Sequence, residues 1–182
     1  MPPPRCRRRQ ISGFLAAVPD FAGTICLPGT HTKWASVADG IVSQFQTAMT
    51  GEIFALLAEK SVLRHSIGQG WDEAAFGDGV RAGHAKPGAL AGNLFSLRAG
   101  SLLQGLTADA ARAQLSGLLI GAELSAAPIG DGEVVVIGGA DLGANYAEAI
   151  RTVGHSARVV DGAGITLAGL RQAWDVLKET FA

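Results

Sequence analysis

The sequence predicts an α/β domain built around a mixed β-sheet. Strand patterns and a tight turn fill the first part of the 182-residue chain, helical patterns fill its middle, and a strand–helix–strand–helix order follows. Strands joined by short turns pair antiparallel, whereas strands joined through a helix pair in parallel. One sheet with both kinds of pairing, covered by helices, is the arrangement that this order favours. The length fits one compact domain.

Three short strands are predicted in the first 50 residues, after the end of a helix. Asp39-Gly40 is a strong two-residue hairpin signal, so the second and third strands are expected to pair antiparallel. Strict alternation along the third strand would place Ile41, Phe45 and Thr47 on one face. The predicted ranges are 10–18 for the helix end and 23–27, 33–38 and 41–47 for the strands.

Helical patterns dominate the middle of the chain. Thr50 and Thr107 precede two of the predicted helices and are expected to cap them through their hydroxyl groups. Gly117 and Gly121 would let the last of these helices approach a neighbouring element closely. The helices are predicted over residues 51–59, 71–85, 90–106 and 108–127.

The last part of the chain returns to strands. The β-branched run at residues 133–137 predicts a buried strand. A helical pattern follows it up to Gly154, which is expected to cap that helix at its C-terminus. A strand at residues 157–160 and an amphipathic helix at residues 165–181 complete the predicted order.

Charge and composition exclude several classes of protein. The net charge of −1 combines four arginines in the first ten residues with a body of 11 basic and 16 acidic residues, hence a body charge of −5. A mildly acidic body argues against nucleic acid as the main partner. No apolar run is long enough to span a membrane, and the basic start lacks the long apolar core of a secretory signal. Cys6 and Cys26 make neither a disulfide framework nor a zinc site, so a reducing cytoplasm is expected.

The loop after the first strand has the composition of a turn that contacts phosphate. Gly29 lets the backbone approach an anion closely, and the hydroxyl groups of Thr30 and Thr32 add hydrogen-bond donors. Lys33 adds a positive charge. Composition alone favours the alternative, an ordinary polar turn, because such turns are common.

Two glycines end the buried strand. Gly138 and Gly139 stand at its carboxyl end, where α/β sheets bind ligands, and would let a flat ligand lie against the backbone. The spacing to Gly143 differs from that of the dinucleotide-binding fingerprint. A tight connection that needs a positive φ is an equal alternative for the glycine pair.

Five segments carry a resemblance to a known family. They are CLPGTHTKW at residues 26–34, TAMTGEIFALL at 47–57, LFSLRAGSLL at 94–103, LSGLLIGAEL at 115–124 and VVVIGGADLGANYAEAI at 134–150. In this order they resemble the 2-dehydro-3-deoxygalactonokinases, sugar-acid kinases of the actin/hexokinase-like superfamily. The resemblance implies an actin-like, ribonuclease H-like ATPase domain, of which this chain would hold the C-terminal part without the N-terminal domain.

The resemblance also assigns the two glycine-containing segments to the two ends of one ATP molecule. The positions that match the phosphate turn are Gly29, Thr30, Thr32 and Lys33, and those that would bound the adenosine are Gly138, Gly139 and Ala140. The implied ligands are ATP with Mg²⁺ and a small sugar acid. The implied reaction transfers the γ-phosphoryl group to the 6-hydroxyl of 2-dehydro-3-deoxy-D-galactonate, in galactonate catabolism.

Three further polar side chains have a functional and a structural interpretation. Arg98 has the guanidinium fork that suits a sugar-acid carboxylate, although a helix-surface arginine is an equal alternative. Glu52 is expected to be an acid at a helix start rather than a catalytic acid. His31 is expected to be an exposed turn residue rather than a phosphate contact. No catalytic residue is identifiable from the sequence.

The chain also departs from the family's pattern. Nothing in it matches the Asp-Trp-Gly-Thr-like phosphate motif with which family members begin. Cys6-Arg7-Arg8-Arg9 stands where relatives carry an acidic segment expected to hold the general base, and arginine cannot accept a proton. Residues 1–9 therefore predict a non-native or disordered basic tip, and residues 10–182 a C-terminal nucleotide-binding domain.

Three functions stay open. The first is the sugar-acid kinase, with this chain alone inactive or weakly active. The second is a nucleotide-binding remnant without turnover, and the third is a related kinase for another sugar acid or an amino sugar. An apolar wall left uncovered by a missing first domain would also promote association into a homo-oligomer.

Overall fold

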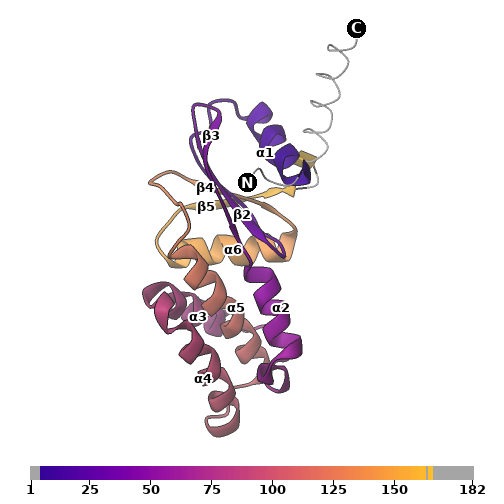
Figure 1. Cartoon of the computed structure of the whole chain (residues 1–182), viewed down its shortest axis with the longest axis vertical. Coiled ribbons are helices and arrows are strands. Elements are labelled where there is room, and N and C mark those ends of the chain that lie inside the picture. Colours follow the sequence, from indigo (N-terminus) through magenta and orange to yellow (C-terminus); the bar gives the residue numbers. More distant parts are fainter. Residues whose placement is uncertain (1–4, 163, 166–182) are drawn as a thin grey trace.

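The predicted α/β class is confirmed by a computed structural model that describes residues 5–162, 164 and 165. A mixed five-stranded sheet lies at one end of the molecule, and a group of helices extends from it (Figure 1). The elements are α1 (Arg5–Ala17), β1 (Gly23–Leu27), β2 (Thr32–Ala38), β3 (Ile41–Ala48), α2 (Thr50–Lys60), the 3₁₀ helix η1 (Val62–His65), α3 (Glu73–Ala85), the 3₁₀ helix η2 (Pro87–Ala89), α4 (Leu90–Leu103), α5 (Ala108–Leu124), β4 (Val134–Gly138), α6 (Ala140–Thr152) and β5 (Ala157–Asp161). Except for its first residue, Ile165, the helix predicted over residues 165–181 falls outside the described residues.

The sheet has the order β3-β2-β1-β4-β5. β1, β2 and β3 pair antiparallel through short turns, and the predicted hairpin turn is confirmed by positive φ values of 52° at Asp39 and 69° at Gly40. β4 pairs in parallel with β1, with Cys26 opposite Val136, and β5 pairs in parallel with β4. Because β1 and β4 run in the same direction, the turn after β1 and the glycines after β4 meet at one edge of the sheet.

Apolar side chains pack on both faces of the sheet. On β4, Val134 and Val136 join a cluster with α3, α5 and α6, whereas Val135 and Ile137 join a cluster with Ile11 and Phe14 of α1. All four β4 side chains have no exposed surface. The buried strand that the β-branched run predicts is therefore confirmed, and the sheet is the middle of three layers.

Helices α3 and α5 approach each other more closely than side chains would allow. Glycines stand at four positions along their contact: Gly79, Gly83, Gly117 and Gly121. A Cβ atom added to Gly121 would lie 2.2 Å from the carbonyl oxygen of Val80, and one added to Gly117 would lie 2.3 Å from that of Phe76. The close approach expected from the small residues of α5 is thus confirmed, with α3 as the neighbour.

Two sequence-based expectations about local structure are wrong. The expected face with both Ile41 and Phe45 is broken by a β-bulge, because Val37 pairs with Val42 and Ser36 with Gln44. Ser43 has no partner in this register, so the strand changes face and leaves Ile41 69% exposed. Strict alternation fails wherever an extra residue enters one strand.

Thr50 does not cap α2. The helix begins at Thr50, Met49 holds the N-cap position without a side-chain hydrogen bond, and the Thr50 hydroxyl donates to Glu123. Thr107 does cap α5, since its hydroxyl accepts a 3.2 Å hydrogen bond from the backbone N–H of Ala110. Gly154 has the positive φ, 95°, expected of a helix C-cap.

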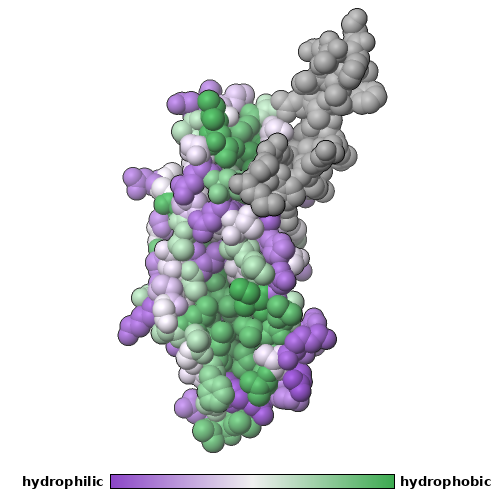
Figure 2. Space-filling view, in the orientation of Figure 1, coloured by the Kyte–Doolittle hydropathy of each residue, from purple (hydrophilic) through white to green (hydrophobic). Residues whose placement is uncertain are grey.

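Exposed apolar side chains gather on the helical half of the molecule. Figure 2 shows an apolar region on this half. Among the exposed side chains are Phe95, Leu102 and Leu103 of α4, at 65%, 63% and 82%, and Leu56 of α2, at 52%. In residues 5–162, 164 and 165, no helix combines the length and the apolar character needed to cross a bilayer.

Candidate nucleotide cleft

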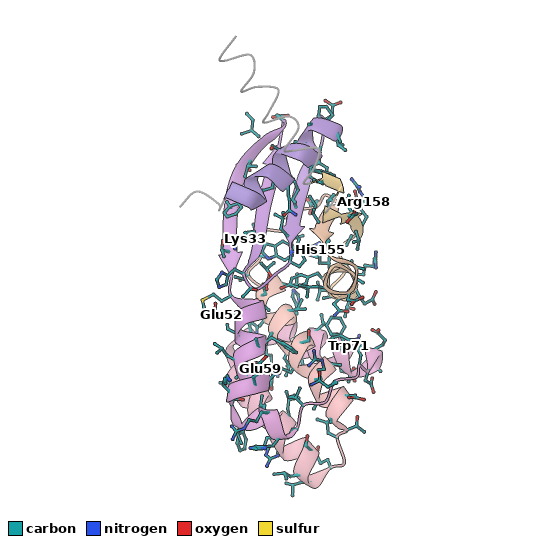
Figure 3. The ribbon with its side chains drawn as sticks, turned by 90° about the vertical axis from the view of Figure 1, so that its right-hand side faces the viewer. Lys33, Glu52, Glu59, Trp71, His155 and Arg158 are labelled. Atoms are coloured by element: carbon teal, nitrogen blue, oxygen red, sulfur yellow. The ribbon has the colours of Figure 1, made fainter. Side chains whose placement is uncertain are left out.

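The turn between β1 and β2 is fixed against the first turn of α2. The backbone N–H of Glu52 donates a 2.9 Å hydrogen bond to the carbonyl oxygen of Thr30. A Cβ atom on Gly51 would lie 2.4 Å from the carbonyl oxygen of Gly29, so only glycine permits this contact. Figure 3 shows Glu52 at the end of α2 that meets the sheet. The turn therefore lies beside a helix N-terminus, which attracts anions.

An ion pair closes the outer side of the same turn. Nε2 of His31 lies 2.5 Å from Oε2 of Glu52, and both side chains are partly exposed, at 46% and 38%. Glu52 also stands in the first turn of α2, as expected of a helix-start acid. His31 is exposed, as expected, and its imidazole bonds Glu52.

The glycine pair after β4 lies next to this turn. A Cβ atom on Gly138 would lie 3.5 Å from Cδ of Pro28, which is ordinary van der Waals contact. Gly139 has a φ of −69°, and a Cβ atom there would meet nothing within 4 Å. The alternative in which these glycines supply a positive φ is wrong. What Gly139 provides is open space beside the backbone.

One cleft of about 250 Å³ reaches from the turn to α6, and Gly138, Gly139 and Ala140 are not among its lining residues. Gly29 from the turn and the start of α2 form part of its lining, and α6 forms another part. Helix α5 and the loop before α3 supply the rest. The lining residues are Gly29, Thr50, Gly51, Phe54, Trp71, Arg112, Ser116, Leu119, Ile120, Asp141, Leu142, Asn145 and Tyr146.

The cleft is mostly apolar, with a few polar side chains among its lining. Arg112 is the cation, and its guanidinium lies 5.3 Å from the centre of the Phe54 ring and donates to the carbonyl oxygen of Gly68 at 3.4 Å. Asp141, in the first turn of α6, is the acid. Among the described residues, the Trp71 indole Nε1 is buried without a hydrogen-bond partner. An apolar cleft with few polar groups is typical of small-molecule sites.

A buried carboxylate lies beneath the cleft and joins its surrounding elements. Glu123 of α5 is 8% exposed and accepts hydrogen bonds from Trp34 Nε1 at 2.6 Å, from the Tyr146 hydroxyl at 2.9 Å and from the Thr50 hydroxyl. The Tyr146 hydroxyl also bonds the Thr32 hydroxyl at 2.7 Å. These donors belong to β2, α2 and α6, so one side chain connects three elements. We call these five side chains the Glu123 network.

Burial governs the ionisation of this network. Desolvation raises the pKa of Glu123, against the opposite effect of the hydrogen bonds from Thr50, Trp34 and Tyr146. Burial, with the nearby Glu123 and Cys26, raises the pKa of Tyr146 well above its ordinary value. Tyr146 is therefore a neutral donor at neutral pH, and three donors compensate for the loss of water around Glu123.

The predicted site residues have different places in the structure. Gly29 lines the cleft and Thr30 is exposed beside it, whereas Thr32 has no exposed surface and its hydroxyl bonds Tyr146. Lys33 is 6% exposed, and its Nζ donates to the carbonyl oxygen of His31 at 2.9 Å. Both side chains stabilise the structure around the turn. The phosphate-binding prediction thus rests on the backbone of Gly29 and Thr30.

The structure does not bring Arg98 to the cleft. Its Nη1 bonds Ser66 Oγ at 3.1 Å, between α4 and η1. The cleft arginine is Arg112, which the sequence alone did not single out. Glu123 was missed as well, although an acid inside the apolar segment LSGLLIGAEL is a sequence signal for a buried polar contact.

Fold and cleft together define an α/β domain with a candidate ligand site at the carboxyl edge of its parallel strands. The sequence profile of the 2-keto-3-deoxy-galactonokinase family matches residues 8–173. This match covers most of the chain, and the chain belongs to that family.

Similar proteins agree with this assignment. The chain is 39% identical over 176 residues to the probable 2-dehydro-3-deoxygalactonokinase DgoK1 of Rhizobium meliloti (strain 1021), with 93% of this chain and 58% of the relative covered. It is 31% identical over 171 residues to the 2-dehydro-3-deoxygalactonokinase of Escherichia coli (strain K12), with 92% and 58% covered. A crystal structure from Sinorhizobium meliloti, provisionally given the same enzyme name, matches with a TM-score of 0.86 and 38% identity, over 94% of this chain and 59% of that chain. The chain thus spans less than two thirds of the length of these relatives.

The volume of the cleft, about 250 Å³, lies just below the range of roughly 300–1,000 Å³ typical of ligand pockets. The open space at Gly139 lies outside the residues that line the cleft. For Mg²⁺, the residues that the structure describes include no group of three or more His, Cys, Asp and Glu side chains that could hold a metal ion. We therefore derive no step through a protein-held metal.

Proposed function

We propose that this chain is the nucleotide-binding part of an ATP-dependent sugar-acid kinase with an actin-like ATPase fold. The substrate would be 2-dehydro-3-deoxy-D-galactonate, phosphorylated at its 6-hydroxyl. The observation that carries the proposal is the single cleft lined by both Gly29 and the start of α6. The names of the relatives support the choice of substrate.

In this proposal the two segments hold the two ends of ATP. The phosphates would lie at the Gly29–Thr30 turn, where the N-terminus of α2 attracts negative charge. The adenosine would lie along Gly138, Gly139 and Ala140, where the backbone is open at Gly139. Asp141 and Asn145 of the cleft would offer polar partners to the nucleoside.

Phosphoryl transfer depends mainly on positioning and on stabilisation of negative charge. This chain's own contribution would be to hold the nucleotide, while Mg²⁺, bound through the phosphates, would neutralise charge. We place the enzyme in the cytoplasm because ATP is its second substrate.

The proposal is tested by calorimetric titration of the chain with ATP and Mg²⁺, using two glycine variants. Gly139→Val would put a branched side chain into the open space, at a φ that valine accepts. Gly130→Val adds the same atoms to an equally open position at the other end of β4. We expect the native chain and Gly130→Val to bind ATP, and Gly139→Val to lose at least tenfold in affinity with an unchanged melting temperature.

Absence of ATP binding by the native chain would overturn the proposal, as would equal affinities of the two variants. Turnover is measured separately, as ADP release with 2-dehydro-3-deoxy-D-galactonate and with other sugar acids and amino sugars. Binding without turnover on any of them would support the nucleotide-binding remnant, and turnover on a different sugar would support the related kinase.

A further inference from the structure

The Glu123 network connects the parts of the cleft where the two ends of a nucleotide would bind. Thr50, at the start of α2, and Tyr146, on α6, both line the cleft and both donate to the same carboxylate. Glu123 itself is not among the lining residues. It can influence a ligand only through the side chains that it holds.

The directions of the hydrogen bonds follow from the donors. Tyr146 has one hydroxyl hydrogen and donates it to Glu123, so Thr32 must donate to the Tyr146 oxygen. Thr50 also has one hydroxyl hydrogen and donates it to Glu123. With Glu123 ionised, both cleft hydroxyl groups therefore point their hydrogens down into the network, and Thr50 offers only lone pairs to any other partner.

A neutral group at position 123 would reverse the direction of some of these hydrogen bonds. Protonated Glu123 carries one hydrogen that needs an acceptor in either Thr50 or Tyr146, and glutamine carries two. When Tyr146 is the acceptor it would turn its own hydrogen to Thr32, and when Thr50 is the acceptor it would have a free hydrogen to direct elsewhere. The direction in which the cleft hydroxyl groups point their hydrogens thus depends on the charge of one buried side chain.

We propose that Glu123 is a positioning residue of the nucleotide cleft, which joins the start of α2 to α6 and orients the Thr50 and Tyr146 hydroxyl groups for the ligand. This inference rests on the proposed nucleotide binding. Within the described part of the chain, two titratable groups act on the network: Tyr146 of α6 touches Glu123, and Cys26 of β1 acts on Tyr146. Loss of one properly oriented hydrogen bond is expected to weaken ATP binding about 3- to 10-fold.

The first experiment compares the dissociation constants of ATP for the native chain and for Glu123→Gln from pH 5 to 8. At pH 8 we expect Glu123→Gln to bind ATP about 3- to 10-fold more weakly than the native chain. As the pH falls and Glu123 takes up a proton, the native chain should come to resemble the variant, so the ratio of the two constants should approach one. Titration of ATP itself cancels in this ratio. A purely structural role would give a constant ratio.

The second experiment does not depend on the folding of Glu123→Gln. Thr50→Val removes a hydroxyl that serves the network, and Thr24→Val is its matched control. The Thr24 hydroxyl is equally buried, but it donates to the carbonyl oxygen of Pro128 at 3.2 Å, outside the network and the cleft. We expect Thr50→Val to weaken ATP binding about 3- to 10-fold and Thr24→Val to leave it unchanged.

The outcomes separate the two proposals. If the native chain binds no ATP at any pH, the proposed function fails and the role of Glu123 fails with it. If the native chain binds ATP and Thr50→Val binds as tightly as Thr24→Val, the role of Glu123 alone is refuted. A ratio of one for Glu123→Gln at pH 8 refutes it in the same way.

Discussion

The close contact between α3 and α5 makes a sharp prediction about two glycine-to-alanine substitutions. In Gly121→Ala, the new Cβ atom would lie 2.2 Å from the backbone oxygen of Val80, about 1 Å closer than such atoms approach. Backbone cannot rotate away as a side chain can, so the two helices must separate. Overpacking costs about 1–3 kcal/mol, and rigid backbone favours the upper end. The higher helix propensity of alanine offsets up to about 1 kcal/mol of this cost, so the free energy of unfolding should fall by about 2 kcal/mol.

The matched control is Gly92→Ala in α4. A Cβ atom there meets nothing within 4 Å, so only the propensity gain of about 0.5–1 kcal/mol remains. In a chain of this length 1 kcal/mol shifts the melting temperature by about 2–4 °C. We therefore expect thermal unfolding, followed by circular dichroism, to show a loss of about 4–8 °C for Gly121→Ala and a gain of about 1–4 °C for Gly92→Ala. Equal shifts would refute the argument that these helices touch through their backbones.

The other predictions concern hydrogen bonds, charge and the exposed apolar surface. Trp34→Phe should destabilise the chain in urea by at least ~1 kcal/mol more than Trp71→Phe, because only the first removes a bond to a buried carboxylate, and equal losses would contradict this. Burial raises the pKa of Glu123 in the folded chain above its unfolded value of about 4.3, so the folded state binds this proton more tightly. The resulting stabilisation of the folded state is complete below the unfolded pKa and is lost as the pH rises through the folded pKa. The stability of Glu123→Gln relative to the native chain should accordingly increase with pH in chemical denaturation, and a pH-independent difference would show that the carboxyl ionises normally. Thr107→Ala should cost about 1 kcal/mol through loss of its cap, and no change in the melting temperature would exclude that role. Sizing chromatography should show association that Leu103→Lys reduces, and a monomeric native chain at high concentration would contradict it.

Local sequence signals predicted most of the fold correctly. The Asp39-Gly40 turn, the β-branched run of β4 and the caps at Thr107 and Gly154 each depend on neighbouring residues, and each is confirmed. The parallel pairing in the sheet was also expected, because a helix joins β4 to β5. A turn, strand or cap that depends only on neighbouring residues can be predicted from a short stretch of sequence.

The failures arise where distant residues decide the structure. The Thr50 hydroxyl bonds Glu123, which lies 73 positions further along the chain, and so it does not cap its own helix. Lys33 stays a predicted phosphate ligand, and its ammonium group also bonds the turn itself. Arg112 lies in the cleft because of the way α5 packs, and no sequence motif predicts that position. The assignment of the two glycine segments to a nucleotide stays a prediction, which came from the family resemblance because composition alone favoured an ordinary turn.

The pairing of β1 with β4 has a consequence for synthesis of the chain. Thr24 lies opposite Val134, so 109 residues separate the two partners in the chain. At about 5–20 residues per second, a ribosome needs roughly 5 to 20 seconds for that stretch. During this interval the inner edge of the hairpin, with Ile25 and Leu27, has no strand beside it. The nascent strand β1 therefore presents an unpaired edge to other chains until translation reaches β4.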